Sequence, residues 1–195
     1  MTKQKVAFVG LGYIGLPTAV VMANSGVDVT GVDVNAANVE KINRGEVTIV
    51  EPGLQEELNK ALSSGRFRAT TEQVHADAYI IAVPTPFTDS YDVDMKFIYS
   101  AAEAIAPQLV GDELIVLEST SPPQTTAKMA ERILEIRTDL VADGAENPDD
   151  KPVIYFAHCP ERILPGYAME ELRTNDRIIG GQTTEATRRA DRKSV

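Results

Sequence analysis

Three glycines near the N-terminus, Gly10, Gly12 and Gly15, have the spacing G-x-G-x-x-G. They follow the apolar run 6–9, which is typical of a buried strand, and they open a helical pattern. In this context the spacing indicates a dinucleotide site. Gly10 permits a tight turn, Gly12 lets a pyrophosphate approach the backbone, and Gly15 lets the helix pack on the strand. The free N–H groups and the positive dipole end of the helix then face the phosphates.

An acidic residue, Asp33, ends the second predicted strand, 28–32, and lies 18 residues after Gly15. A carboxylate there accepts both ribose hydroxyls of the adenosine half of a dinucleotide and repels a 2′-phosphate. The next residues, 35–37, contain no arginine to receive such a phosphate, so the sequence predicts NAD rather than NADP. The alternative is a glycine-rich turn with Asp33 as a helix cap. The coincidence of strand, glycine spacing, helix, second strand and terminal acid favours the cofactor site.

Hydroxyl side chains follow two further predicted strands at their carboxyl ends, where doubly wound sheets bind ligands. Thr85, between two prolines, offers a hydroxyl to the cofactor, although a Pro-Thr-Pro run alone is also typical of a rigid turn. Thr120 lies in the run 118–123, which places three hydroxyls near the expected nicotinamide position. Thr125 and Thr126 begin the following helix, where capping is the alternative role of their hydroxyls.

Glu161 and Arg162 follow the last predicted strand. The pair indicates either acid–base machinery with an anion clamp or a surface ion pair of little energetic value, and both remain open. Cys159 has no neighbouring base or helix N-terminus, which favours a buried small residue over a nucleophile. His75 and His158 lack metal-ligand spacing, so no metal site is predicted.

The elements that must position these side chains alternate between apolar strands and helices. Strands are predicted at 6–9, 28–32, 67–69, 78–83, 113–117 and 153–157, and helices at 14–25, 35–44, 54–63, 95–109 and 125–136. This alternation predicts an α/β fold, a doubly wound parallel sheet of the Rossmann type in three layers, α/β/α. We assign residues 1–181 to this domain. Residues 182–195 form an atypical basic tail without apolar periodicity, for which a frayed or truncated helix is favoured over an arm that binds an anionic surface.

The composition narrows the classes of function. The chain has 195 residues, of which 43% are hydrophobic and 25% charged, as is ordinary for a globular domain. Its net charge of −10 argues against a nucleic-acid partner, because phosphate backbones require a basic face. The single cysteine favours a reducing compartment. The sequence contains no signal-peptide pattern and no apolar run of membrane-spanning length, so a cytoplasmic protein without membrane insertion is expected.

Seven runs of the chain, taken in order, resemble the UDP-glucose/GDP-mannose dehydrogenase family. They are GLGYIGLP (10–17), GVD (31–33) followed by NRG (43–45), EPGL (51–54), VPTPF (83–87), ESTSP (118–122), CPERILPG (159–166) and NDRIIGG (175–181). VPTPF, ESTSP and CPERILPG most resemble the branch that acts on UDP-N-acetyl-D-mannosamine, with the UDP-N-acetylglucosamine branch close behind.

The resemblance implies an NAD-dependent 6-dehydrogenase that oxidises the C6 alcohol of a UDP-sugar to the carboxylate for surface polysaccharide biosynthesis. Two NAD are used, and a thiohemiacetal forms on a cysteine. Residues that match NAD-contacting positions of the family are Tyr13, Ile14, Asp33, Thr85 and Thr126. Arg162 and Ile163 match positions that touch the UDP-sugar. Glu161 and Thr120 match positions that assist catalysis by holding a water or the reacting oxygen.

The chain also departs from the family pattern. The family's catalytic cysteine, lysine and asparagine, which belong to a second domain and to a central dimer-forming helix, have no counterpart here, and Cys159 belongs to a different motif. Gln124 replaces a glycine common in the family, and residues 187–195 do not resemble the expected continuation. These departures imply a truncated chain, inactive alone, that self-associates or forms a homodimer. The alternatives are a dehydrogenase for another nucleotide sugar and a non-catalytic NAD-binding module.

Overall fold

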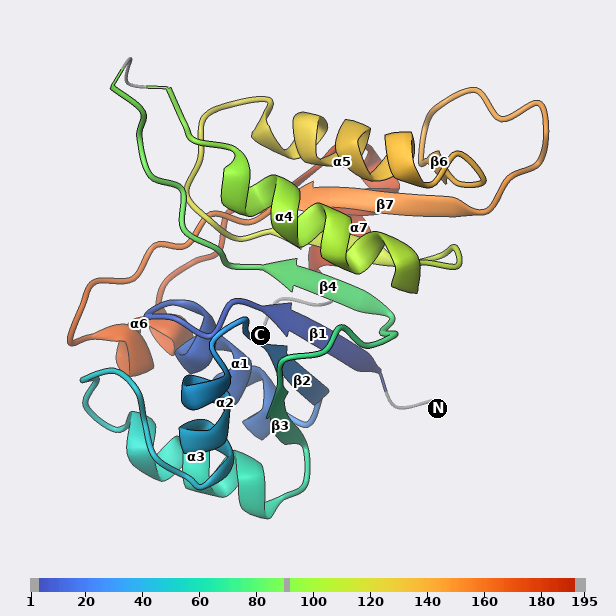
Figure 1. Ribbon diagram of the computed structural model, residues 1–195. Coiled ribbons are helices and arrows are strands. Elements are labelled where there is room, and N and C mark those ends of the chain that lie inside the picture. Colours follow the sequence, from blue (N-terminus) through green and yellow to red (C-terminus); the bar gives the residue numbers. More distant parts are fainter. Residues whose placement is uncertain (1–3, 90–91, 192–195) are drawn as a thin grey trace.

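The computed structural model describes residues 4–89 and 92–191 and shows a twisted sheet with helices on both faces (Figure 1). Its strands follow the order β3-β2-β1-β4-β5-β7-β6, and β8 pairs with β7 outside this path. Their bounds are β1 (Lys5–Val9), β2 (Asp28–Val32), β3 (Phe67–Thr70), β4 (Ala78–Ile81), β5 (Leu114–Leu117), β6 (Val141–Ala142), β7 (Val153–His158) and β8 (Gly180–Gly181). These strands pair in parallel except for β7 with β8. The strand order reverses between β1 and β4, where doubly wound sheets bind their ligands.

Helices cover both faces of the sheet, so the predicted α/β/α Rossmann architecture is confirmed. In β1, Val6 and Phe8 pack into one core cluster, whereas Ala7 and Val9 pack into the other, because successive side chains point to opposite faces. The first cluster lies under α1 (Gly15–Asn24), α2 (Ala36–Asn43), α3 (Leu54–Ser63), α6 (Ala168–Thr174) and α7 (Thr184–Asp191). The second lies under α4 (Lys96–Ile105) and α5 (Thr125–Ile136).

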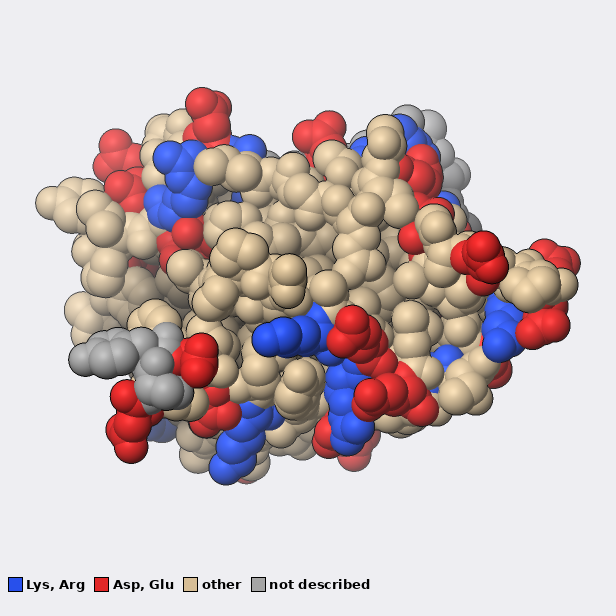
Figure 2. All heavy atoms as spheres, turned by 90° about the horizontal axis from the view of Figure 1, so that it is seen from above, with Lys and Arg blue, Asp and Glu red and all other residues tan. Residues whose placement is uncertain are grey.

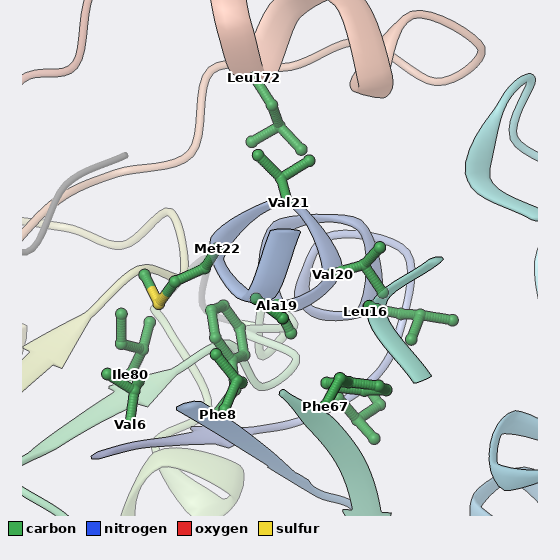
Figure 3. Packing of buried hydrophobic residues seen from close by; sticks show 14 of the residues in the cluster. Val6, Phe8, Leu16, Ala19, Val20, Val21, Met22, Phe67, Ile80 and Leu172 are labelled. Atoms are coloured by element: carbon green, nitrogen blue, oxygen red, sulfur yellow. The ribbon is translucent and has the colours of Figure 1, made fainter. Parts of the chain in front are cut away.

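Helix α1 is apolar on all sides, and residues 15–23 are all buried. Figure 3 shows Met22 pointing toward Ile80 on β4, while Leu172 of α6 points at Val21 from the opposite side. Each fully buried side chain of this size contributes about 1.5–3 kcal/mol of transfer free energy. Packing on the sheet and against α6 therefore holds α1, which begins at Gly15, the last glycine of the turn.

Most predicted elements agree with the structure, and the bounds 28–32, 54–63 and 125–136 agree to the residue. The predicted helix 95–109 was too long: α4 ends at Ile105, and a 3₁₀ turn, Ala106–Gln108, follows around Pro107. Proline lacks the N–H that would continue the α-helical ladder. The short elements β6, β8 and α6 were not predicted, because two-residue strands and a seven-residue helix carry too little periodic signal.

Residues 184–191, which the charge pattern set apart as a basic tail, form α7. Ala186 and Ala190 are buried, and these small side chains pack closely without producing the apolar periodicity of larger residues. The Arg189 guanidinium lies 3.6 Å from the centre of the Tyr155 ring, and its Nη1 lies 2.8 Å from Asp112. Arg192 and Lys193, two further basic residues of the tail, lie outside the described residues. None of the helices in the described ranges has the length and apolar character that a membrane span requires.

Candidate active site

The glycine-rich turn joins β1 to α1, and its three glycines have different surroundings. Gly10 has φ +96°, and a Cβ there would lie 2.3 Å from the Ala82 carbonyl oxygen. A Cβ at Gly15 would lie 1.8 Å from the Gly10 carbonyl oxygen, so both positions exclude a side chain for reasons internal to the fold. A Cβ at Gly12 would meet no atom within 4 Å, and the space that it would enter belongs to a cleft. The backbone at Gly12 is thus open to a ligand.

This cleft has an empty volume of about 1160 Å³, part of it open to solvent. Ligand pockets in proteins have volumes of roughly 300–1000 Å³, so an extended ligand fits. The cleft lies at the switch point of the sheet, between the ends of β1, β2 and β4 and one side of α4. Its lining is Val9, Gly10, Gly12, Tyr13, Ile14, Val32, Asp33, Val34, Gln73, Ala82, Val83, Pro84, Phe97, Ser100, Ala101 and Ala104.

The α4 side of the cleft, with Phe97, Ser100, Ala101 and Ala104, was not predicted from the sequence. Val34, which is 98% exposed and directly follows Asp33, lines the same cleft. Apolar side chains that line a cleft beside a carboxylate suit a flat aromatic ring such as adenine. The valine that directly follows the terminal acid of the second strand was the available sequence signal for this side of the cleft.

Asp33 is oriented by backbone hydrogen bonds. Its Oδ2 accepts from the Leu11 N–H at 2.8 Å, and its Oδ1 accepts from the Asn35 N–H at 2.9 Å. Because a carboxylate has about four acceptor positions, capacity remains for ribose hydroxyls. The alternative role of Asp33 as a helix cap is wrong: the N-cap of α2 is Asn35, whose side chain accepts from the Asn38 N–H.

The α1 N-terminus fits an anion. Its N-cap, Ile14, makes no side-chain capping bond, and the first turn contains no acidic residue. The first N–H groups of a helix have no partner within the helix, and they carry the positive end of its dipole. Together with the open backbone at Gly12 and the carboxylate of Asp33, these groups fit the pyrophosphate and ribose of a dinucleotide.

The loops after β4 and β5 are tied to each other. The Thr85 hydroxyl donates to the Thr120 carbonyl oxygen at 2.8 Å, and the Ser119 hydroxyl donates to the Val83 carbonyl oxygen at 2.7 Å. Thr126 lies in the first turn of α5, and Thr125 donates to the Pro122 carbonyl oxygen. The N-cap of α5 is neither threonine, so capping by them is wrong; Gln124 holds that position with a left-handed φ of +73°.

Glu161 and Arg162 take separate partners in the segment after β7. The Glu161 side chain accepts from the Ile163 N–H, and Arg162 donates to the Asp176 carbonyl oxygen at 3.1 Å. The surface ion pair considered above therefore does not form between these two side chains. The Ile163 side chain is buried in the core.

A buried ion pair that the sequence analysis missed lies beneath this segment. Glu118 Oε1 and Arg177 Nη2 are 2.6 Å apart, and the Glu118 side chain is 3% exposed. Burial raises the pKa of Glu118 to about 7, although the nearby Arg177 charge opposes that shift. Cys159 is buried next to the pair, and burial raises its thiol pKa, which confirms the interpretation of a buried small residue. The sequence signals that could have indicated this ion pair were a glutamate at the end of a predicted strand and an arginine within the run NDRIIGG.

The charges on the surface are interspersed. On the face shown in Figure 2, Lys and Arg side chains lie beside Asp and Glu side chains, and no broad basic patch is present there. Among the described residues, no three His, Cys, Asp or Glu side chains are grouped so that they could hold a metal ion.

The chain belongs to the UDP-glucose/GDP-mannose dehydrogenase family: the family's NAD binding domain matches residues 4–193. Among particular relatives, it is 47% identical over 190 residues to the UDP-N-acetyl-D-mannosamine dehydrogenase of Escherichia coli (strain K12), with 97% of this chain and 45% of that protein covered. It is 48% identical over 189 residues to the NDP-N-acetyl-D-galactosaminuronic acid dehydrogenase of Ralstonia nicotianae, covering 97% of this chain and 44% of the relative.

A solved structure of the UDP-N-acetyl-mannosamine dehydrogenase from S. aureus superposes with a TM-score of 0.86 at 41% identity, covering 98% of this chain and 45% of that one. The chain thus spans less than half the length of these relatives. The predicted family and its NAD cofactor are confirmed.

Proposed function

We propose that this chain supplies the NAD-binding half of a nucleotide-sugar 6-dehydrogenase whose substrate is UDP-N-acetyl-D-mannosamine. The observation that carries the proposal is the cleft at the β1–β4 switch point, where the backbone at Gly12 is open and Asp33, held by the Leu11 N–H, lines the same cleft. The reaction converts the C6 alcohol of the sugar to a carboxylate. Hydride acceptance is the chemistry that NAD supplies, two electrons per molecule, so this four-electron oxidation uses two NAD and one water.

The proposal assigns each predicted site residue a role. Gly10, Gly12, Tyr13, Ile14 and Gly15 surround the pyrophosphate, Asp33 holds the adenosine ribose, and Thr85 and Thr126 flank the nicotinamide half. Thr120 and Glu161 hold the reacting oxygen or the water near the end of β5. Arg162 and the backbone at Ile163 face the UDP-sugar.

The covalent step of the reaction needs a thiolate outside this sequence. Cys159 is buried, and its raised pKa keeps the thiol protonated, which opposes nucleophilic attack. We therefore propose that the chain alone binds NAD and does not oxidise the sugar. The buried, unpaired thiol is also consistent with a cytoplasmic protein. The relative named for N-acetyl-D-galactosaminuronic acid supports a second candidate function, oxidation of another N-acetylhexosamine nucleotide.

Calorimetric titration of the chain with NAD, and with NADP as control, tests the cofactor assignment. We expect saturable NAD binding and much weaker NADP binding. Asp33→Ala should weaken NAD binding by about tenfold to a hundredfold, the loss expected for hydrogen bonds to a charged group. Asp28→Asn, at the other end of β2, where the carboxylate pairs with Arg66, is the matched control and should bind NAD normally. Equal affinity for NAD and NADP, or binding of neither, would contradict the proposal.

A further inference from the structure

The carboxylate of Glu51, in the EPGL run before α3, joins two distant segments of the chain. Glu51 is 7% exposed. Its Oε2 accepts from the Tyr13 hydroxyl at 2.5 Å and from the Gly166 N–H at 2.9 Å, and its Oε1 accepts from the Ala168 N–H at 2.8 Å. The Tyr13 hydroxyl oxygen also accepts from the Gly166 N–H at 2.7 Å. Both oxygens of one buried carboxylate are thus engaged, on one side by the glycine-rich turn and on the other by the end of CPERILPG.

The Glu51 carboxylate is held in its charged form. Hydrogen bonds from Tyr13, Gly166 and Ala168 lower its pKa, although desolvation, the largest single effect, acts in the opposite direction. The charge also lies at the N-terminus of α6, which begins at Ala168, where a negative charge is favoured. Hydrogen bonds to an ionised acceptor are roughly twice as strong as neutral ones. The position of the segment near Gly166 therefore depends on Glu51.

Tyr13 belongs to both the cleft and this network. It lines the dinucleotide cleft, while its hydroxyl reaches Glu51. The segment 161–166 carries the residues assigned above to catalysis and to the UDP-sugar, and its other end is held by the Glu161 N–H, which donates to the Glu118 carbonyl oxygen at 3.1 Å. A ligand that restrains Tyr13 therefore also restrains the Gly166 end of the segment, through the Glu51 carboxylate.

We propose that Glu51 is a positioning residue that couples NAD binding at the glycine-rich turn to the order of the segment 161–168. The proposal rests on the function proposed above. Neither Glu51 nor Gly166 lines the cleft, so the coupling acts through Tyr13. NAD bound at the turn orders the surface that receives the UDP-sugar, and binding of the two ligands is cooperative.

Hydrogen exchange of the backbone amides in 161–168, measured with and without saturating NAD, tests the coupling. In the wild-type chain we expect NAD to slow exchange of these amides. In Tyr13→Phe, which keeps the Glu51 bonds to Gly166 and Ala168, NAD should no longer slow it. Saturation with NAD, established by calorimetry for each variant, keeps a change of affinity from affecting the comparison. In Glu51→Gln the same amides should exchange about tenfold faster or more even without NAD, as expected for the loss of hydrogen bonds to a charged acceptor.

Glu170→Gln is the matched control. Glu170 is an exposed carboxylate in the first turn of α6, the helix whose N-terminus lies at Glu51. It should leave the NAD effect on 161–168 unchanged. An NAD effect on these amides that persists in either Tyr13→Phe or Glu51→Gln would overturn the coupling, and so would its absence from the wild-type chain at saturation. A wild-type chain that calorimetry shows not to bind NAD would instead overturn the proposed function itself.

Discussion

The carboxylate of Glu118 and the guanidinium of Arg177 meet at 2.6 Å inside the domain, although 59 residues separate them in the sequence. The backbone carbonyl of Glu118 also accepts from the Glu161 N–H, so the residue that pairs with Arg177 holds the start of the candidate catalytic segment. Among the described residues, the second carboxylate oxygen of Glu118 is buried without a hydrogen-bond partner. Burial raises the pKa of this half-satisfied acid to about 7, so its protonation changes near neutral pH.

The stability of the chain should depend on pH through Glu118. Because burial raises its folded-state pKa to about 7 from an ordinary value of 4.5, the native state holds this proton more tightly than the unfolded state does. The stabilisation is complete below about pH 4.5 and is lost as the pH rises to about 7. Thermal unfolding of the wild type and Glu118→Gln at pH 5 and pH 8 measures this effect.

Glutamine stays neutral at every pH, so the melting temperature of the wild type should fall relative to that of Glu118→Gln as the pH rises from 5 to 8. Each kcal/mol corresponds to about 2–4 °C in a chain of this size. If instead the melting temperature of the wild type rose relative to that of Glu118→Gln from pH 5 to pH 8, the native state would favour the charged form of Glu118.

Position 124 stores backbone strain. Gln124 has φ +73°, its side chain is exposed, and α5 begins at the next residue. A non-glycine residue in the left-handed region costs about 1–2 kcal/mol, and glycine removes most of this cost. Gln124→Gly should therefore raise the free energy of unfolding by about 1 kcal/mol in urea titrations. Glu131→Gly, at an exposed position within α5, is the control and should lower it by about the same amount. Destabilisation by both substitutions would exclude strain at Gln124.

Features that depend on neighbouring residues could be predicted from the sequence, whereas contacts between residues far apart in the chain could not. The helices 54–63 and 125–136 were predicted to the residue because a local apolar pattern marks them and a glycine or prolines mark their ends. The tight turn at Gly10 and the acid that ends the second strand, Asp33, could be predicted because the pattern that marks them lies within one βαβ unit. The contacts of Glu118 with Arg177 and of Glu51 with Gly166 join residues 59 and 115 positions apart, and no local pattern encodes such pairs.

The apolar surface of the segment after β7 should cause self-association. Leu164 and Tyr167 are 61% and 59% exposed, and the Tyr167 N–H donates to the Leu164 carbonyl, which places both on one turn. Exposed apolar clusters of this kind mark contact surfaces. Light scattering after size exclusion should show a mass that rises with concentration, and Leu164→Ser combined with Tyr167→Ser should suppress the rise. Val110→Ser, at a 63% exposed valine elsewhere, is the control. A monodisperse wild-type monomer at high concentration would contradict the prediction.

Substitutions at two glycines of the turn should have different effects, one on NAD affinity and the other on the free energy of unfolding. A methyl group at Gly12 meets no protein atom within 4 Å, and its φ is not in the left-handed region, so Gly12→Ala should change the free energy of unfolding by no more than about 0.5 kcal/mol. The same methyl group would enter the space that the proposed function assigns to a pyrophosphate, so NAD affinity should fall by about tenfold or more. Calorimetry with NAD and urea unfolding measure the two quantities on one sample.

Gly15→Ala is the counterpart, because its methyl group would lie 1.8 Å from the Gly10 carbonyl oxygen. The turn must move to relieve that clash, so this variant should lose about 1–3 kcal/mol of stability or more before any ligand is added. If Gly12→Ala bound NAD as tightly as the wild type, the pyrophosphate could not lie over Gly12. The cofactor would then have to enter the cleft from the α4 side without touching the turn, and the fingerprint would serve only to join β1 to α1.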